Sequence, residues 1–352
     1  MKILAFESSC DETAAAVVED GRRILSDVIA SQADMHALYG GVVPELASRK
    51  HVEAIAALTE QSLREAGCGR EEIDAVAVTY APGLIGAVLV GLSFAKSVAY
   101  AWGKPLIPVH HVRGHIAANY LAFPELEPPF LALAISGGNT LIVDVRDYTD
   151  LKILGATRDD AAGECFDKAA RVLGLPYPGG KPLDELAQQS QGGVYTLPRA
   201  NVDGAELDMS FSGLKTAVVN LAHHAEQTGR PLDRAALARD FTNAVSGELV
   251  PRVMKALELT GRRTLCAAGG VAANSVIRAD LQAACKKAGC RLCLPPLKLC
   301  GDNGAMIGAQ GYYEFLAGNT AGMDLNAYAT RAIDRCTAGA PRRGRRTGRT
   351  KQ

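Results

Sequence analysis

The sequence predicts an α/β protein of two lobes, in which a βββαβα unit occurs twice. With 352 residues and 48% hydrophobic residues, the chain can form two cores of ordinary size. A triplet of short strands with alternating hydrophobicity occurs near the N-terminus and again after residue 130. In each half a later strand runs into a glycine-bearing turn and a helix. These observations together indicate duplicated halves.

The first triplet lies at the N-terminus and encloses a polar loop. The loop covers Ser8 to Thr13, and Gly21 turns the chain between the second and third strands. Helices and a later strand follow this triplet. The strands are expected at residues 2–7, 14–19, 24–29 and 75–79.

The second triplet repeats this order. A tight loop from Ser136 to Asn139 joins its first two strands. The strands are expected at residues 130–135, 140–145, 152–156 and 264–268. By comparison of the two halves, we expect residues 1–125 in one lobe, 126–304 in the other, and a helix near 305–330 returning to the first.

The two later strands lead into Ala81–Gly86 and Gly269–Asn274. A strand, a glycine-rich turn and a helix N-terminus make an anion site, because free backbone N–H groups face the turn. One such turn is weak evidence, but two at matching places are stronger. A meander with crossover helices, present twice, is typical of the actin, hexokinase and Hsp70-like fold, which holds a nucleotide between its lobes. The hairpin Ser136–Thr140 is then a phosphate contact.

Charge and cysteine content narrow the class of protein. Lys plus Arg equals Asp plus Glu, at 38 each, so no overall field indicates a nucleic-acid partner. The basic run Arg342–Lys351 lies in a tail, residues 331–352, for which a solvated role is favoured over phosphate contacts. Nine scattered cysteines and no signal peptide indicate a reducing cytoplasm. No apolar run reaches the roughly 18 residues of a membrane span. The Cys290 and Cys293 thiols are read as core residues.

His111 and His115 are four residues apart, so on a helix both imidazoles project from one face. That spacing suits two ligands of one metal ion. The zinc-peptidase pattern places a Glu directly after the first His, where this chain has Val112. A metallopeptidase therefore lacks its general base here.

A carboxylate is the usual third ligand beside two histidines. Asp302 is the best candidate, although at a loop-to-helix junction Asp is equally typical as an N-cap. Asp160, Glu164 and Asp167 compete with it, and their spacing predicts one helical face. In the N-terminal loop, Asp11 and Glu12 are candidates to accept a proton. Cys10 lacks the basic neighbour that an activated thiol needs, and His110 is expected to pack.

Nine segments in order resemble one family, the bacterial tRNA N6-adenosine threonylcarbamoyltransferases (TsaD), once labelled O-sialoglycoprotein endopeptidases. The series is specific although no single motif is. The segments are Glu7–Thr13, Gly40–Arg49, Ala81–Leu84, His110–His115, Ser136–Gly138, Pro176–Gly180, Ser210–Thr216, Gly269–Asn274 and Asp302–Met306. In that family Glu often stands between the metal histidines, where this chain has Arg113.

The resemblance implies that His111, His115 and Asp302 bind one divalent metal, with Fe(2+) favoured and Zn(2+) the alternative. The pocket for threonylcarbamoyl-AMP, or for ATP, would be lined by Ala134, Ile135, Ser136, Gly137, Gly138, Asp167, Gly180, Asp184 and Asn274. The family moves the threonylcarbamoyl group to N6 of adenosine 37 in tRNAs that read codons beginning with A, and AMP leaves. Asp11 or Glu12 is our hypothesis for the base.

Partners also follow from the resemblance. These are tRNA, a paralogous TsaB-like scaffold, a TsaE-like ATPase, and a separate TsaC-like synthase that supplies the adenylate. Three other functions compete with the transferase. A metallopeptidase explains none of the nucleotide loops, and a sugar kinase leaves the His pair unexplained. A nucleotide-binding scaffold of the same complex is expected to lack the complete metal triad.

Overall fold

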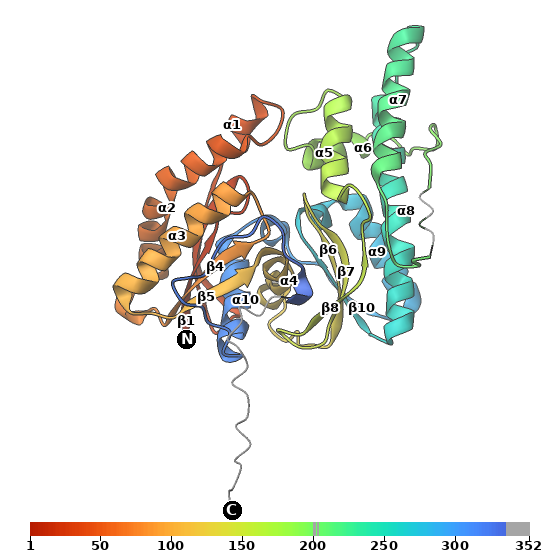
Figure 1. The fold of residues 1–352 in the computed structure, drawn as a ribbon. Coiled ribbons are helices and arrows are strands. Elements are labelled where there is room, and N and C mark those ends of the chain that lie inside the picture. The colour runs from red at the N-terminus through yellow and green to blue at the C-terminus, as the bar shows by residue number, and fades with distance from the viewer. Residues whose placement is uncertain (200–201, 203, 336–352) are drawn as a thin grey trace, which may run out of the picture.

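The computed structural model describes residues 1–199, 202 and 204–335, and it contains two five-stranded sheets. Their strand orders are β3-β2-β1-β4-β5 and β8-β7-β6-β9-β10, so the second sheet repeats the topology of the first. In both sheets the first three strands are antiparallel and the later two are parallel. The predicted duplicated α/β fold of two lobes is therefore confirmed (Figure 1). The basic run Arg342–Lys351 lies outside the described residues.

The N-terminal sheet and its helices come from the first third of the chain. Their bounds are β1 (Lys2–Glu7), β2 (Glu12–Glu19), β3 (Arg23–Ser31), α1 (Ala33–Ala37), α2 (Pro44–Ala66), β4 (Ala75–Ala81), α3 (Ile85–Trp102), β5 (Leu106–His110) and α4 (His111–Ala122), with a 3-10 turn η1 (Arg70–Glu72). β2 starts two residues earlier than expected, so Glu12 and Thr13 belong to a strand rather than to the polar loop. β5 was not predicted.

The C-terminal sheet is followed by the helix that returns to the N-terminal one. Its elements are β6 (Phe130–Ile135), β7 (Thr140–Val145), β8 (Leu151–Ala156), α5 (Ala162–Val172), α6 (Gly180–Ala187), α7 (Ser212–Thr228), α8 (Arg234–Thr260), β9 (Thr264–Ala268), η2 (Gly270–Ala273), α9 (Ser275–Ala288), β10 (Arg291–Cys293), η3 (Leu297–Leu299), α10 (Gly304–Leu316) and η4 (Ile333–Arg335).

Alternation along β1 explains how the N-terminal sheet is covered on both faces. Leu4 and Phe6 belong to the core beneath α2 and α3, whereas Ile3 and Ala5 belong to the core beneath α10. Successive side chains of a strand point to opposite faces, so one strand supplies two cores. All of these side chains are fully buried.

Helices α4 and α10 pack against each other between the two sheets (Figure 1). α4 contacts β4 and β5 on one side and β6 and β9 on the other. Gly114 permits the close approach of the two helices, because a Cβ at this position would lie 2.7 Å from Ile307 Cδ1. The residues at the start of these two helices are therefore held at the centre of the molecule.

Helix α3 differs from the expectation that no apolar run is long enough to span a membrane. Its 18 residues have a mean hydropathy of 1.5, so by length and composition this helix meets the test for a membrane span. Core helices of globular proteins pass the same test, and one such helix is weak evidence. Lys96 interrupts the apolar run, and its Nζ donates to the carbonyl of Leu325. The helix packs on β4 and α2.

After α10 the chain crosses back over the N-terminal sheet. The amide of Ala321 donates to the carbonyl of Leu106, and the amide of Tyr328 donates to the carbonyl of Tyr80. Further on, the side chain of Ile333 is buried and its carbonyl accepts from Arg113. Through these contacts the segment stabilises the position of α4 and of the neighbouring strand β5.

Candidate metal centre and interlobe cleft

The His pair stands where β5 passes directly into α4. His110 is the N-cap, and its Nδ1 accepts a hydrogen bond from the amide of Val112. Its Nε2 lies 3.0 Å from the carbonyl oxygen of Arg331. Burial lowers the pKa of His110 to about 3, so this imidazole is neutral. As expected, His110 packs, while His111 and His115 face elsewhere.

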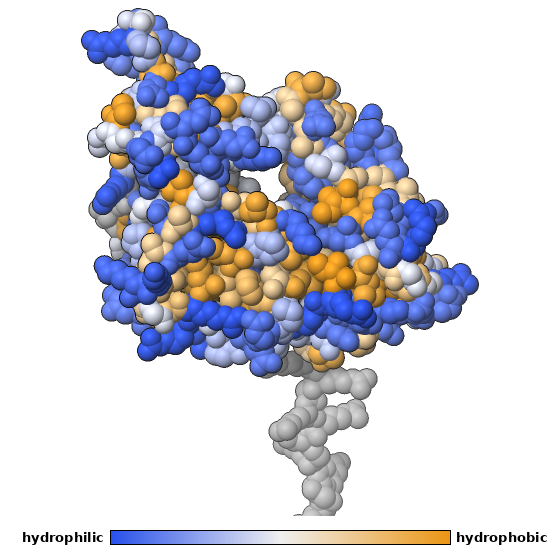
Figure 2. All heavy atoms as spheres, turned by 180° about the vertical axis from the view of Figure 1, so that it is seen from behind, coloured by the Kyte–Doolittle hydropathy of each residue, from blue (hydrophilic) through white to orange (hydrophobic). Residues whose placement is uncertain are grey.

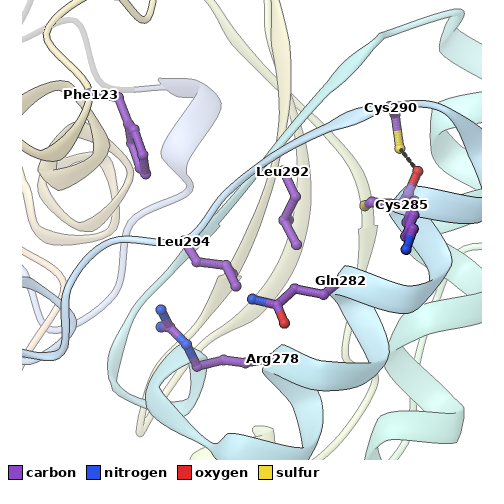
Figure 3. A pocket seen from close by; sticks show the side chains of 8 residues that line it. Phe123, Arg278, Gln282, Cys285, Cys290, Leu292 and Leu294 are labelled. Carbon is purple, nitrogen blue, oxygen red and sulfur yellow. Dashed lines mark hydrogen bonds between the residues drawn. The ribbon is translucent and has the colours of Figure 1, made fainter.

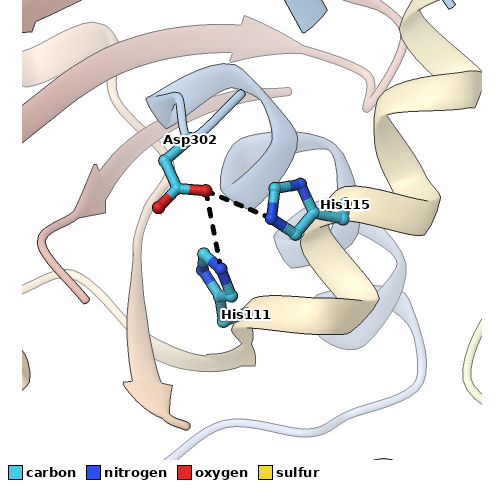
Figure 4. A group of neighbouring side chains, drawn as sticks. All are labelled: His111, His115 and Asp302. Carbon is cyan, nitrogen blue, oxygen red and sulfur yellow. Dashed lines mark ion pairs between the residues drawn. The ribbon is translucent and has the colours of Figure 1, made fainter. Parts of the chain in front are cut away.

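The two imidazoles converge on the carboxylate of Asp302 (Figure 4). Nε2 of His115 lies 3.1 Å from Asp302 Oδ1, and Nε2 of His111 lies 3.6 Å from the same oxygen. The rings meet edge to face, with centroids 4.6 Å apart. Both imidazoles are buried, whereas the Asp302 side chain is 19% exposed. The group is therefore reached from the side of Asp302.

Asp302 does not cap α10, which was its alternative role. The N-cap is Asn303, whose Oδ1 accepts from the amide of Met306. Asp27 accepts from the first two amides of the helix, those of Gly304 and Ala305. With the helix terminus satisfied by two other side chains, Asp302 is available to the histidines.

The competing carboxylates are engaged elsewhere. Asp160 forms ion pairs with Lys168 and Lys215, and Glu164 pairs with Lys168. Asp167 accepts from the amide of Gly179. The prediction of one helical face was wrong, because α5 begins at Ala162 and leaves Asp160 in the preceding loop. Within the described residues, only His111, His115 and Asp302 form a group with metal-ligand geometry.

Neighbouring charges shift the pKa values of His111 and Asp302 in opposite directions. Burial alone would lower the pKa of His111, but the negative charges of Asp302 and Glu7 raise it to about 9. Burial would likewise raise the pKa of Asp302, and His111 and His115 lower it to about 2. The surroundings thus favour positive charge between these side chains, and metal binding would compete with the imidazole proton.

The surroundings of His115 indicate whether these residues fit a metal ion. Neither ring nitrogen makes a hydrogen bond of regular geometry with any described residue, although the side chain is only 1% exposed and Nε2 lies 3.1 Å from Asp302 Oδ1. Buried polar atoms are almost always partnered, so an unpartnered ring nitrogen that faces a carboxylate needs another explanation. Two imidazoles and one carboxylate are a donor set that iron(II) and zinc both accept. The residues therefore fit a borderline divalent ion.

Glu7 belongs to the centre, and the sequence reading missed it. This carboxylate is fully buried at the end of β1, and its Oε2 lies 3.0 Å from Nδ1 of His111. The only sequence signal was one acidic residue at the end of an apolar strand. Such a residue is equally common where a strand simply emerges into solvent.

The candidate bases Asp11 and Glu12 follow β1 across a short loop. Asp11 is 7% exposed, and its Oδ2 accepts from the hydroxyl of Tyr177 at 3.3 Å. Glu12 accepts from Ser31, and burial, together with the charges of Asp302 and Asp11, raises its pKa to about 9. Burial also raises the pKa of Cys10, in agreement with the expectation that this thiol is not activated.

The two glycine turns of the C-terminal lobe lie next to each other. Gly269 has a φ of +91°, and a Cβ there would lie 2.4 Å from the carbonyl oxygen of Ile135. In the β6–β7 loop, Gly137 and Gly138 are exposed and have open space beside them. The Oγ of Ser136 is buried and makes no hydrogen bond with any residue that the structure describes. The carboxyl end of the central strand β6 thus carries an unpartnered hydroxyl beside two exposed glycines.

The remaining predicted pocket residues lie at the end of a strand, within a helix or at a helix N-cap, all in the C-terminal lobe. Ala134 and Ile135 end β6 and are buried. Asp184 accepts from the amide and hydroxyl of Ser275, and Asn274 caps α9. Gly180 begins α6, with open space beside it.

A pocket of about 210 Å³ lies between the lobes. Gly40 and Gly41 line it from the N-terminal side, and Asp167, Arg171 and Tyr177 line it from the other. Arg171 also donates to the carbonyl of Gly40, so the lobes touch across the pocket. Figure 2, which views the molecule from behind relative to Figure 1, shows open space between the two lobes.

A larger pocket, of about 440 Å³, lies away from the His pair. Arg278 and Gln282 of α9 form one wall, and Leu292 and Leu294 lie opposite (Figure 3). Lys286 of the same helix also lines the pocket. Arg278 donates to the carbonyls of Ala272 and Pro295. None of the predicted site residues lines this pocket, so its size does not make it the candidate site.

Comparison with known sequences gives one consistent family. The family model described as "TsaD: tRNA N6-adenosine threonylcarbamoyltransferase" matches residues 23–309. A protein of that name from Moorella thermoacetica is 53% identical over 325 residues, which cover 92% of this chain and 95% of the relative. Another from Clostridium botulinum (strain 657 / Type Ba4) is 49% identical over 327 residues, covering 93% and 96% of the two chains.

Solved structures support the fold at low sequence identity. HypF from T. kodakarensis superimposes with a TM-score of 0.60 at 14% identity, covering 90% of this chain and 48% of HypF. A full-length HypF in a phosphate- and nucleotide-bound form gives a TM-score of 0.56 at 15% identity, covering 88% and 46%. Component A of (R)-2-hydroxyglutaryl-CoA dehydratase from Acidaminococcus fermentans gives 0.50 at 14%, covering 89% and 98%.

Proposed function

This chain belongs to the tRNA N6-adenosine threonylcarbamoyltransferase family, and we propose that its His111, His115 and Asp302 hold the metal ion used in that transfer. The chain is accordingly a transferase that modifies tRNA. The observation that carries the proposal is the convergence of two buried imidazoles and one carboxylate. The ion would be divalent, with Fe(2+) favoured and Zn(2+) the alternative. When bound, it supplies Lewis-acid polarisation of an acyl or threonyl oxygen.

The donor is threonylcarbamoyl-AMP, held in the cleft between the lobes. In this proposal the lobes are residues 1–125 with α10, and residues 126–304. Gly137 and Gly138 bind phosphate oxygens through their amides, and Ser136 binds them through its hydroxyl, because its own amide donates to the carbonyl of Asn139. Asp167, Gly180, Asp184 and Asn274 surround the nucleoside, whether it is the adenylate or ATP. The support is the unpartnered Ser136 hydroxyl and the open space beside three of these glycines.

Transfer joins N6 of adenosine 37 to the carbamoyl carbon and breaks the bond from that carbon to the phosphate oxygen of AMP. AMP leaves with the electron pair of the broken bond, and N6 loses a proton. Asp11 or Glu12 accepts this proton, and Asp11 is the better candidate, because the pKa of Glu12 is raised to about 9 and its carboxyl would first have to lose its own proton. The hydrogen bond from Tyr177 to Asp11 supports the assignment, because it places this carboxylate of the N-terminal lobe against the opposite lobe. The cleft holds the adenylate and the acceptor in line.

Replacement of the ligands tests the proposal. His115→Ala should lose bound metal and the transfer of threonylcarbamoyl from its adenylate to tRNA. The matched control is His224→Ala, an exposed histidine on α7. Separately, Asp11→Asn and Glu12→Gln should retain metal while one of them slows transfer. Full activity in His115→Ala would contradict the metal assignment, and full activity in both carboxylate variants would remove the proposed base.

The competing functions have less support. A metallopeptidase needs a general base beside the histidines, and Arg113 between them is buried against Glu314. A nucleotide-binding scaffold would not need the complete metal triad. An assay of the purified chain, mixed with its partners, separates these functions. Transfer to tRNA without hydrolysis of glycoproteins would support the transferase and exclude the peptidase and the scaffold.

The transfer is proposed to take place in the cytoplasm, within an assembly. The assembly contains a TsaB-like scaffold and a TsaE-like ATPase, and a TsaC-like synthase supplies the adenylate. Support for a reducing compartment comes from the eight described cysteines, all of which are free. Gel filtration of the chain mixed with each purified partner tests the assembly directly.

A further inference from the structure

Glu7 has an environment that general packing does not explain. It ends a strand whose other side chains, apart from Lys2, are buried and apolar, and its own side chain is fully buried. A buried carboxylate is unfavourable unless its charge and oxygens are satisfied. The side chains that satisfy Glu7 therefore indicate why the residue is there.

Three donors surround the carboxylate. Oε2 accepts from the hydroxyl of Thr79 at 2.6 Å and lies 3.0 Å from Nδ1 of His111. Oε1 accepts from the amide of Ser9 at 2.5 Å. β4, the N-terminal loop and the first residue of α4 thus meet at one buried carboxylate. Among these donors, only the imidazole can present its nitrogens in two tautomers.

The Glu7 contact decides which nitrogen of His111 faces the metal centre. An ionised carboxylate is an acceptor only, so Nδ1 must carry the proton when His111 is a metal ligand. Nε2, on the side of Asp302, then has its lone pair free. Ser9 Oγ lies 3.1 Å from the same Nδ1 and can support this arrangement as an acceptor. Nothing comparable holds His115, whose Nδ1 makes no hydrogen bond within the described chain.

We propose that Glu7 is a positioning residue of the metal centre, which fixes His111 as an Nε2 ligand through a carboxylate–imidazole hydrogen bond. The inference deepens the proposed function, since it rests on His111 as a metal ligand. Carboxylates that bind the second nitrogen of a ligating histidine orient the ring and strengthen the ligand, and their loss typically weakens metal binding 10–100-fold. The hydrogen bonds of Glu7 within the described residues go to Ser9, Thr79 and His111, and none of them joins it to Asp302 or His115.

The first experiment measures the tautomer of His111 in the chain with Glu7 intact. The full chain labelled with ¹⁵N-histidine is loaded with Zn(2+), and the His111 signals are assigned by their loss in His111→Asn. We expect a protonated Nδ1 and a metal-bound Nε2 for His111. A metal-bound Nδ1 or a protonated Nε2 would overturn the inference, whatever the behaviour of the variants.

The second experiment measures affinity for Zn(2+) by competition with a chelating dye. Glu7→Gln should weaken binding by about 10–100-fold, because the amide lacks the charge and cannot accept from all three donors. The control is Asp144→Asn. Asp144 is a buried carboxylate that pairs with Arg262 within the C-terminal lobe, so its replacement should leave the Zn(2+) affinity unchanged. If Glu7 only supported the fold, Glu7→Gln would lower the melting temperature while its Zn(2+) affinity matched wild type.

The outcomes separate this inference from the proposed function. A wild-type chain that binds no Zn(2+) or Fe(2+) overturns both. Metal binding by wild type, with equal affinity in folded Glu7→Gln, overturns the role of Glu7 and leaves the metal centre intact. Weaker binding in Glu7→Gln and in Asp144→Asn alike would assign the effect to general destabilisation and would also overturn the role of Glu7.

Discussion

Arg113 and Glu314 form an ion pair buried between α4 and α10, with Nη1 2.9 Å from Oε1. Both side chains are nearly inaccessible, at 3% and 2% exposed. α4 carries the two histidines, and α10 begins two residues after Asp302. The pair therefore ties together the two helices whose first residues make the candidate metal centre.

Loss of the arginine should strongly destabilise the chain. Arg113→Met leaves the Glu314 carboxylate buried, with only the amides of Gln310 and Asn319 as side-chain donors, and also leaves the carbonyl of Ile333 without its partner. Breaking a buried pair in this way costs about 3 kcal/mol or more. Urea unfolding measures the change. The matched control, Lys50→Met in the exposed pair with Glu53, should stay within about 0.5 kcal/mol. Equal effects of the two variants would contradict this account.

Local sequence patterns were sufficient to predict much of the fold. β1, β6, β7 and β9 have the predicted bounds, because alternation and turn residues define strands that are covered on both faces. β5 was missed, since its Leu-Ile-Pro-Val-His sequence contains a proline and directly continues into a helix. Its pairing with β4 is a long-range contact that no local signal contains.

The candidate site could be predicted only in part. Helical spacing is a local property, so His111 and His115 were placed on one face correctly. Asp302 is nearly two hundred residues away, and the sequence could not decide between a ligand and an N-cap until Asn303 was seen to cap α10. Glu7 was missed because its contact with His111 joins residues 104 apart.

Metal removal should lower stability. An ion that binds only the folded chain stabilises it by about 2.7 kcal/mol at a concentration 100 times its dissociation constant. The melting temperature with excess Zn(2+) should therefore fall when EDTA is added. Asp302→Asn should respond much less, because a neutral amide is a weaker ligand than a carboxylate. An EDTA response in Asp302→Asn as large as in wild type would place the ion elsewhere.

The pair of Asp144 with Arg262 predicts a stability change in acid. Burial alone would raise the pKa of Asp144, but hydrogen bonds from Arg262, at 2.7 and 3.2 Å, and from Arg146 lower it. A carboxyl with a lowered pKa in the folded state contributes stability that is present above its unfolded pKa, about 3.9. This contribution is lost as the pH falls through the folded value.

Asp144→Asn should therefore be less stable than wild type by about 2 kcal/mol near pH 7, as expected for hydrogen bonds to a charged group. The difference should be constant from about pH 5 to 8 and shrink below about pH 4. Denaturant unfolding of both proteins at each pH measures it, and the comparison cancels the other carboxylates that titrate in this range. A difference that persists unchanged at pH 3 would contradict the ion-pair explanation.

Gly163 tests the phosphate role of the β6–β7 loop. It is the second residue of α5, and a Cβ there would lie 2.5 Å from the carbonyl oxygen of Ser136 and 2.8 Å from Gly137 Cα. Both neighbours are backbone atoms, so Gly163→Ala must displace the loop whose amides are proposed to bind phosphate. Overpacking of this kind costs roughly 1–3 kcal/mol, and a displaced loop should weaken ATP binding about tenfold or more.

The matched control for this prediction is Gly247→Ala, an exposed glycine within α8 that has open space beside it. Alanine favours the helix over glycine by up to about 1 kcal/mol, so this variant should be as stable as wild type or more stable, with unchanged ATP affinity. Calorimetric titration with ATP compares the three proteins. If folded Gly163→Ala bound ATP as wild type does, the phosphates would have to lie away from Ser136 and Gly137, and the turn at Gly269–Asn274 would become the better candidate.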